Sequence, residues 1–519
     1  MCFVDFKKAF DSLNRSALFL KMENKGIGGN FLKLVKDMYS NTVYSCKFGD
    51  SYTEPFLANL GVKQGDSLSP SLFNLFVDDI KSYFMDNTKS SPVSLGAHSF
   101  NHLLYADDLV IFSESPSGLQ YCINALDTYC EKWKLNINTK KTKVMIFSKT
   151  ESKVKKDIYS NMFNFKDTAL EIVKEYKYLG LSIASNGKLN LAAELLSQKA
   201  RKAFFGLKSN IPASYNLSVQ KWLKLYNSMI TPILTYGSEI WIVDHKINMD
   251  NLQNFSFEKT QNMIMKQILG VHGKTSNLAI HSELGIDPLC FKTFKLMFKY
   301  YNRLIKIEQS EHHLYDLLRS AFEVDKQLCS QNNTSWLKYF KNLKTLFKLD
   351  TMDMSPSQFS KEMSKYYSGK LTNQLIHIKN SETGKLRFFS KIYTKFELQN
   401  YLTYNINKHI CSLLTKFRLS AHSLAIETGR YCKPITPANE RFCKACKDKV
   451  EDEHHFLIDC PLYNSVRDKF FTLFNQIPNE TTQMTINRLL NPSSSQDLNN
   501  ICLFLKEAYS LRDSVFKNI

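Results

Sequence analysis

The chain lacks the long apolar segments that a membrane protein needs. None of its uncharged apolar runs approaches the length of a membrane-spanning helix, and no secretory signal pattern opens the sequence. No internal repeat or low-complexity tract is evident. We therefore expect a cytoplasmic or nuclear protein, and the sequence does not distinguish between these two compartments.

Acidic residues are scarce relative to basic ones. The 519 residues include 68 Lys and Arg against 49 Asp and Glu, which gives a formal net charge of +19. Basic side chains gain affinity for nucleic acids by displacing counterions from phosphates, so this excess favours a polyanionic partner over a membrane surface. The length suggests roughly three domains, and the 43% hydrophobic residues are enough to build their cores.

Basic residues are concentrated in two stretches. Residues 131–157 hold nine lysines against three acids, and residues 370–418 hold nine Lys or Arg against two acids. Aromatic residues interrupt the second stretch, as in proteins that stack single-stranded bases between cations. The alternative, favoured for this stretch, is a set of amphipathic helices whose aromatic residues enter a core. These aromatic residues are Phe388, Phe389, Tyr393, Phe396, Tyr401, Tyr404 and Phe417.

Two adjacent aspartates, Asp107 and Asp108, lie between short apolar runs. The runs, residues 103–104 and 109–112, predict two buried strands joined by a turn. Paired aspartates at such a turn are one means of holding the two Mg²⁺ ions of a phosphoryl-transfer site. A solvated Asp-Asp turn is the alternative for this segment alone. A third carboxylate, Asp5, ends another predicted strand near the start of the chain.

The order of the neighbouring segments adds specificity. Residues 61–70 predict a turn-rich loop, in which Ser69 is the predicted N-cap and Pro70 the first-turn proline of a helix. Taken together, these segments resemble the palm of a reverse transcriptase, and their residue patterns are most similar to those of non-LTR (LINE-type) retrotransposons. The resemblance covers residues 1 to about 185. It implies that Asp5, Asp107 and Asp108 are catalytic and bind two Mg²⁺ ions.

The resemblance also implies a nucleotide-binding site. Phe10 matches the aromatic residue that closes against the sugar and disfavours a 2′-hydroxyl. Gln64 and Gly65 match the loop that lines the nucleotide pocket, where glycine lets the backbone approach the ligand. Lys141 matches the lysine near the triphosphate, with Lys143 as the alternative.

The implied substrates are an RNA template, a DNA primer and deoxynucleoside triphosphates. Tyr178, Leu179 and Gly180 match the hairpin that grips the primer end. Beyond residue 185, apolar residues recur at three- and four-residue spacing, which predicts a helical bundle. Enzymes of this type carry a thumb there.

A second motif near the end of the chain has metal-ligand spacing. Cys443, Cys446, His455 and Cys460 form a Cys-x2-Cys-x8-His-x4-Cys pattern, which fits a structural, tetrahedral Zn²⁺ site. His454 is the alternative histidine ligand. His455 is preferred because the residues that follow it resemble the end of a LINE-type Cys-Cys-His-Cys knuckle. Residues 418–422 and 429–431 also resemble the approach to this knuckle.

These observations predict an α+β protein with five parts. A right-hand polymerase palm, an antiparallel sheet with helices, would occupy residues 1–185 with the fingers largely missing. An all-helical thumb would follow at 186–345, a basic helical and loop region at 346–435, the zinc knuckle at 436–466, and a C-terminal tail at 467–519.

The resemblance places finger segments and an endonuclease domain upstream of the residue that corresponds to Asp5, yet Met1 stands only four residues before it. We therefore expect a truncated reading frame or a gene-model fragment of an RNA-directed DNA polymerase. The alternatives are a catalytically inactive, nucleic-acid-binding remnant of the same element and a polymerase of another type.

Overall fold

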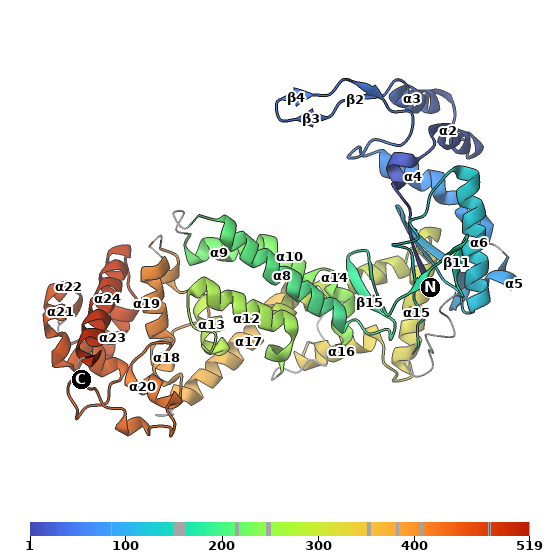
Figure 1. Ribbon diagram of the computed structural model, residues 1–519. Coiled ribbons are helices and arrows are strands. Elements are labelled where there is room, and N and C mark those ends of the chain that lie inside the picture. Colours follow the sequence, from blue (N-terminus) through green and yellow to red (C-terminus); the bar gives the residue numbers. More distant parts are fainter. Residues whose placement is uncertain are drawn as a thin grey trace. The chain divides into compact units, whose positions relative to one another are not determined.

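The computed structural model describes two compact units (Figure 1). Unit 1 comprises Met1–Ala192 and Arg303–Lys338, and unit 2 comprises Ala193–Asn302 and Tyr339–Ile519. The description covers residues 1–517 except 85, 149–161, 213–216, 245–250, 350–353, 380–383, 405, 407, 476 and 478. The predicted division into five parts remains a prediction.

Unit 1 is built on a five-stranded sheet. The strand order is β13-β10-β1-β9-β8, and all pairs are antiparallel except the parallel pair β10–β13. The sequence predicted an antiparallel sheet, and the parallel pair arises where the chain returns to the sheet after residue 169. The strands are β1 (Cys2–Asp5), β8 (His102–Tyr105), β9 (Asp108–Ile111), β10 (Lys143–Val144) and β13 (Glu171–Ile172).

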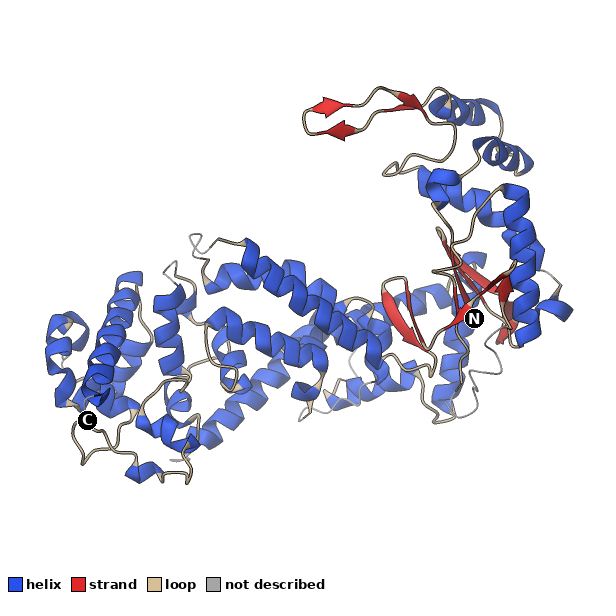
Figure 2. Cartoon of the chain, viewed as in Figure 1, coloured by secondary structure: helices blue, strands red, loops and turns tan. Residues whose placement is uncertain are grey.

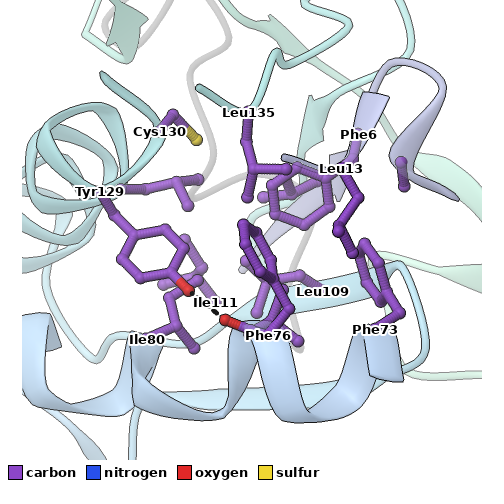
Figure 3. Packing of buried hydrophobic residues seen from close by; sticks show 14 of the residues in the cluster. Phe6, Leu13, Phe73, Phe76, Ile80, Leu109, Ile111, Tyr129, Cys130 and Leu135 are labelled. Carbon is purple, nitrogen blue, oxygen red and sulfur yellow. Dashed lines mark hydrogen bonds between the residues drawn. The ribbon is translucent and has the colours of Figure 1, made fainter. Parts of the chain in front are cut away.

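Helices cover one face of this sheet. Cys2, Val4, Leu109 and Ile111 alternate along β1 and β9 and join a large buried cluster, because successive strand residues point to opposite faces. Figure 3 shows part of the cluster, in which the Tyr129 hydroxyl donates a hydrogen bond to the Phe76 carbonyl at 3.2 Å. The helices of unit 1 are α1 (Ala9–Ser12), α2 (Arg15–Asn24), α3 (Gly29–Tyr39), α4 (Ser69–Val77), α5 (Asn87–Ser90), α6 (Pro116–Trp133) and α15 (Asp316–Ser330).

The opposite face of the sheet carries a smaller cluster. Phe3, Val110 and Met145 are buried there, and Tyr176, Tyr178 and other residues near the hairpin of β14 (Glu175–Tyr178) and β15 (Leu181–Ala184) pack against them. Asp5 lies two residues after Phe3 in β1, and Asp108 lies two residues before Val110 in β9. Both carboxylates therefore belong to this second face.

Short two-stranded ribbons complete unit 1. One extends from the end of α3 (Figure 1) and exposes apolar side chains, including Phe48, which is 88% exposed. Another, β6–β7, lies beside α15, where His98 Nδ1 is 2.7 Å from Ser320 Oγ. Residues 303–338 thus belong to the sheet-containing unit. The ribbon strands are β2 (Val43–Tyr44), β3 (Lys47–Phe48), β4 (Ser51–Tyr52), β5 (Phe56–Leu57), β6 (Val93–Leu95), β7 (His98–Phe100), β11 (Asn164–Phe165) and β12 (Thr168–Ala169).

Regular structure after Ala184 is helical in the described part of the chain, apart from two isolated bridges (Figure 2). Helices α8 (Asn190–Asn210), α14 (Leu289–Glu308) and α16 (Trp336–Leu346) cross the borders between the units. Within unit 2, the buried Arg418 guanidinium pairs with Glu283, with Nε 2.6 Å from Oε1. The remaining helices of unit 2 are α9 (Val219–Leu225), α10 (Thr231–Thr235), α11 (Ser238–Trp241), α12 (Ser256–Leu269), α13 (Asn277–Leu284), α17 (Pro356–Lys379), α18 (Arg387–Ile392), α19 (Lys408–Arg418), α20 (Ala425–Thr428), α21 (Asn464–Lys469), α22 (Phe471–Phe474), α23 (Thr482–Leu490) and α24 (Ser495–Lys517).

Candidate polymerase active site and Cys-His cluster

Asp5 and Asp108 are brought together by strand register. They are directly opposed partners in the antiparallel pair β1–β9, in which opposed Cα atoms lie about 4.5–5.5 Å apart. Asp107 precedes Asp108 in the turn between β8 and β9, where Ala106 has a φ of 53°. The three predicted catalytic carboxylates thus lie where β1 ends and β9 begins, at one end of these two neighbouring strands.

The electrostatic environment of these carboxylates reflects their proximity. Burial, followed by the negative charges of Asp107 and Asp5, raises the pKa of Asp108. A cation is the natural partner for carboxylates that repel one another in this way. Within the described chain, the ion pair that involves these carboxylates is formed by Lys141, whose Nζ lies 4.0 Å from Asp5 Oδ1.

Lys143, the alternative to Lys141, points to a different partner. Its Nζ lies 2.7 Å from Glu171 Oε2 on the neighbouring strand β13. Thr142, between the two lysines, was missed by the sequence reasoning. Its hydroxyl accepts a hydrogen bond from the Asp5 backbone N–H at 3.1 Å and so fixes the end of β1.

The loop that contains Gln64 and Gly65 lies against the start of the chain. Gln64 Nε2 donates to Asp11 Oδ1 at 2.8 Å, and Gly65 has a φ of 82°, which favours glycine. Phe10 is partly buried and packs on Phe73, with ring centroids 4.8 Å apart. Three of the four predicted nucleotide-site residues, all except Lys141, are therefore positioned by α1, α4 and the loop before α4.

The start of α4 differs from the prediction. The helix begins at Ser69 with Leu68 as its N-cap, so Ser69 does not cap it. Its hydroxyl instead donates to the Lys63 carbonyl at 2.6 Å. This bond closes the loop around Gln64. Because the Ser69 hydroxyl is used in it, that hydroxyl does not cap the helix.

Arg15 is the main residue that the sequence reasoning missed in this region. Its buried guanidinium donates to the carbonyls of Gly61, Ala58 and Leu60 at 2.8, 2.6 and 3.2 Å, and also to Tyr39. A single fork of donors thereby holds the backbone that leads into the Gln64 loop. A lone Arg at a helix start carries no sequence signal for this role.

The predicted primer-grip residues form a tight hairpin turn. Tyr178 pairs with Leu181, and Leu179 and Gly180 have φ values of 46° and 84°. Tyr176, on the same hairpin, stacks on Phe3 with ring centroids 4.2 Å apart. Burial, and then the charges of Asp5 and Asp108, raise the pKa of Tyr176, which places this hairpin beside the carboxylates.

The Cys and His residues of the second motif also converge. One ligand atom from each of Cys443, Cys446, His455 and Cys460 lies within 4.8 Å of the others. Cys446 Sγ is 3.6 Å from Cys460 Sγ, and Nε2 of His455 is buried with no hydrogen-bond partner among the described residues. His454 is instead paired with Asp459, with Nδ1 3.0 Å from Oδ2. The donor set fits a tetrahedral metal ion, since Zn–S bonds of about 2.3 Å separate sulfurs by slightly less than 4 Å.

Comparison with known proteins identifies the sheet-containing part of the chain. Residues 1–183 match the family described as reverse transcriptase (RNA-dependent DNA polymerase). The chain contains a reverse-transcriptase domain. A "Probable RNA-directed DNA polymerase from transposon BS" of Drosophila melanogaster is 22% identical over 58% of this chain and 32% of that protein. An "RNA-directed DNA polymerase from mobile element jockey" of Drosophila funebris is 21% identical over the same shares of the two proteins.

A third relative is a "Retrovirus-related Pol polyprotein from type-1 retrotransposable element R2" of Nasonia vitripennis, 27% identical over 39% of this chain and 21% of that protein. The predicted kinship with LINE-type reverse transcriptases is therefore confirmed. The chain spans about a third or less of the length of these relatives. The palm assignment for the reverse-transcriptase domain follows from the same match.

The aromatic residues of the second basic stretch are largely core residues. Phe388, Phe389, Tyr401 and Phe417 are at most 5% exposed, which agrees with the amphipathic-helix interpretation of this stretch. The first basic stretch lies partly outside the described residues. No helix in the described parts of the chain is both long and apolar enough to cross a bilayer.

Proposed function

We propose that the chain catalyses RNA-directed DNA synthesis, in which a primer 3′-hydroxyl attacks the α-phosphate of a deoxynucleoside triphosphate. The opposed pair Asp5 and Asp108 is the single observation that carries this proposal. Together with Asp107, this pair places three carboxylates at the same end of strands β1 and β9. Hard divalent cations such as Mg²⁺ prefer such oxygen ligands.

Two Mg²⁺ ions, when bound, would activate the attacking oxygen and stabilise the leaving one. The chain itself contributes position and charge. Asp5 is held by its backbone bond to Thr142, and Asp108 by its place in β9. Lys141, near Asp5, is the cation proposed to neutralise charge on the triphosphate, because phosphoryl transfer depends mainly on positioning and charge stabilisation.

The substrate-binding roles follow the sequence resemblance. Gln64, Gly65 and Phe10 would line the nucleotide site, with Phe10 disfavouring a 2′-hydroxyl. The Tyr178–Gly180 turn would hold the primer end. The hairpin's stacking of Tyr176 on Phe3 supports this role, because it fixes the turn beside the sheet face that carries the carboxylates.

For the rest of the chain we propose supporting roles. The helical region after residue 185 would act as a thumb on the primer-template duplex. The Cys443, Cys446, His455 and Cys460 cluster would hold one structural Zn²⁺, since four soft ligands leave no open position for catalysis. Action in the cytoplasm or nucleus is part of the same proposal.

Primer extension tests the main proposal. The full chain is incubated with Mg²⁺, an RNA template, a labelled DNA primer and either deoxynucleotides or ribonucleotides. The expected result is extension with deoxynucleotides only. A chain that binds the primer-template without extending it would instead support the binding-remnant alternative, and extension with ribonucleotides alone would indicate another type of polymerase.

A further inference from the structure

A cavity of about 230 Å³ in unit 2 is lined by polar side chains that are incompletely hydrogen-bonded. Thr275 Oγ1, Ser420 Oγ, His422 Nδ1 and Glu427 Oε1 are buried and have no hydrogen-bond partner within the described chain. Thr275, Ser420 and Glu427 are at most 3% exposed, and the His422 side chain is 1% exposed. Since about 90% or more of buried polar groups in native proteins are paired, four unpaired atoms around one cavity indicate a polar ligand.

The chemistry of these atoms defines what the ligand must offer. His422 Nε2 lies 3.1 Å from Glu453 Oε1, which leaves Nδ1 as the second hydrogen-bonding atom of the ring. Glu427 Oε2 accepts from Arg430 Nε at 3.0 Å, which leaves Oε1 as a second acceptor. The hydroxyls of Thr275 and Ser420 can donate or accept. The unpaired Glu427 Oε1 therefore calls for an N–H donor on the ligand.

The rim of the cavity has a different character. Lys274 Nζ and Lys385 Nζ lie 5.7 and 5.9 Å from the ring centroid of Tyr431, and Lys385 also donates to the Tyr431 hydroxyl at 3.2 Å. The ring is well exposed, at 58% for the whole residue. Ammonium groups beside an exposed aromatic ring suit a base linked to a phosphate.

We propose that this cavity binds one unpaired nucleobase of a single-stranded nucleic acid. The base carries an exocyclic amino group, which donates to Glu427, while His422 Nδ1 bonds to the same edge of the base and the adjoining phosphate contacts Lys274 and Lys385. A carboxylate that accepts from the N4 amino group of cytosine is an established pairing. The site gives a role to Ser420, His422 and Tyr431 from the two segments before the Cys-His cluster, and it is independent of the proposed polymerase activity.

Binding of short RNAs to the full chain tests the proposal. Fluorescence anisotropy compares octamers of cytidine, of uridine and of abasic ribose phosphate, without added Mg²⁺ so that the polymerase site contributes little. Cytosine and uracil have nearly the same shape, but cytosine presents an amino donor and an acceptor N3 where uracil presents an acceptor O4, which a carboxylate repels, and an N3–H donor. The expected result is roughly tenfold tighter binding of the cytidine octamer than of the uridine octamer, and the weakest binding for the abasic octamer. Equal binding of all three would overturn the proposal and indicate a plain anion site.

Variants assign the preference to this cavity. Glu427→Gln should abolish the preference for cytidine, because an amide can also donate to uracil, and Tyr431→Ala should weaken binding of both base-bearing octamers several-fold. Lys506→Ala removes one exposed charge from α24 and serves as the matched control, with the preference retained. A folded Glu427→Gln variant that keeps the full preference would refute the site.

Hydroxyl variants cover the case in which Glu427→Gln does not fold. Thr275→Val and Ser420→Ala each remove a buried, unpaired hydroxyl, so neither should destabilise the free protein. Each should nevertheless weaken binding of the cytidine octamer by about threefold or more. Unchanged binding in both variants would overturn the proposal.

Discussion

Asp5 and Asp108 stand directly opposite each other on neighbouring antiparallel strands. This pairing depends on strand register, because a slip of one residue would turn Asp5 toward the helix-packed core on the other face. The alternation that buries Val4 and Leu109 therefore also sets the position of the carboxylates. Packing of the core and assembly of the proposed metal site are specified by the same residues.

Replacing Asp108 by Asn should abolish DNA synthesis without harming the fold. We expect primer extension to fall by about 100-fold or more. The thermal unfolding temperature should stay equal or rise, because burial and the neighbouring Asp107 and Asp5 already disfavour the charged side chain. Extension rates and melting curves measure the two effects. Asp37→Asn, which removes an exposed charge from α3, is the control and should leave both unchanged.

Replacing Arg15 by Met should destabilise the reverse-transcriptase domain. The variant leaves the carbonyls of Gly61, Ala58 and Leu60 without their donor, which should lower the free energy of unfolding by about 2–4 kcal/mol. The apparent KM for deoxynucleotides should rise because the Gln64 loop loses its support. Denaturant unfolding and steady-state extension kinetics test this expectation, and Lys33→Met in α3 provides a surface control. A stable variant with an unchanged KM would contradict the positioning role.

Glu258 should make unit 2 less stable as the pH rises. Burial raises its pKa from 4.5 to about 7, so between these values the folded state binds more protons than the unfolded state. The stabilisation that this group gives to the folded state is therefore fully present below pH 4.5, and it is lost as the pH rises to 7. The decline amounts to about 3 kcal/mol.

Melting curves of Glu258→Gln isolate this effect. The variant cannot ionise at this position, so its stability relative to the wild type should increase steadily from pH 5 to pH 7. The control Glu194→Gln, an exposed residue on α8, should show no such trend. A difference between wild type and Glu258→Gln that does not vary with pH would contradict the assigned pKa.

Replacing His455 and replacing His454 should have different effects on the bound metal. Protein purified with zinc should contain about one metal ion per chain, and His455→Ala should lower both metal content and the stability of the C-terminal region. His454→Ala should retain the metal, since its side chain pairs with Asp459 instead. Elemental analysis of the purified variants decides between them. Metal retained in His455→Ala but lost in His454→Ala would reverse the assignment.

The sequence predicted the parts of the site that depend on local patterns. The short apolar runs on either side of Asp107 and Asp108 were enough to predict two strands joined at these carboxylates, because continuous apolar runs of this length are typical of buried strands. The spacing of Cys443 and Cys446 likewise predicted a cluster, since two cysteines three positions apart can reach one point.

Long-range contacts were beyond such patterns. The bonds from Arg15 to residues 58–61 and the parallel pairing of β10 with β13 join segments whose separation in the sequence carries no periodic signal. Ser69 shows the same limit at short range. Its residue type favours a helix cap, but a tertiary partner, the Lys63 carbonyl, takes its hydroxyl.

The return of residues 303–338 to the sheet-containing unit has a practical consequence for fragment design. An expression clone stopped near residue 185 would omit α15, and with it Ser320, whose Oγ lies 2.7 Å from His98 Nδ1. The face of the β6–β7 ribbon that packs on α15 would then be exposed to water and to other molecules. Insoluble material from such a clone would reflect where the gene was cut, and not the quality of the catalytic domain.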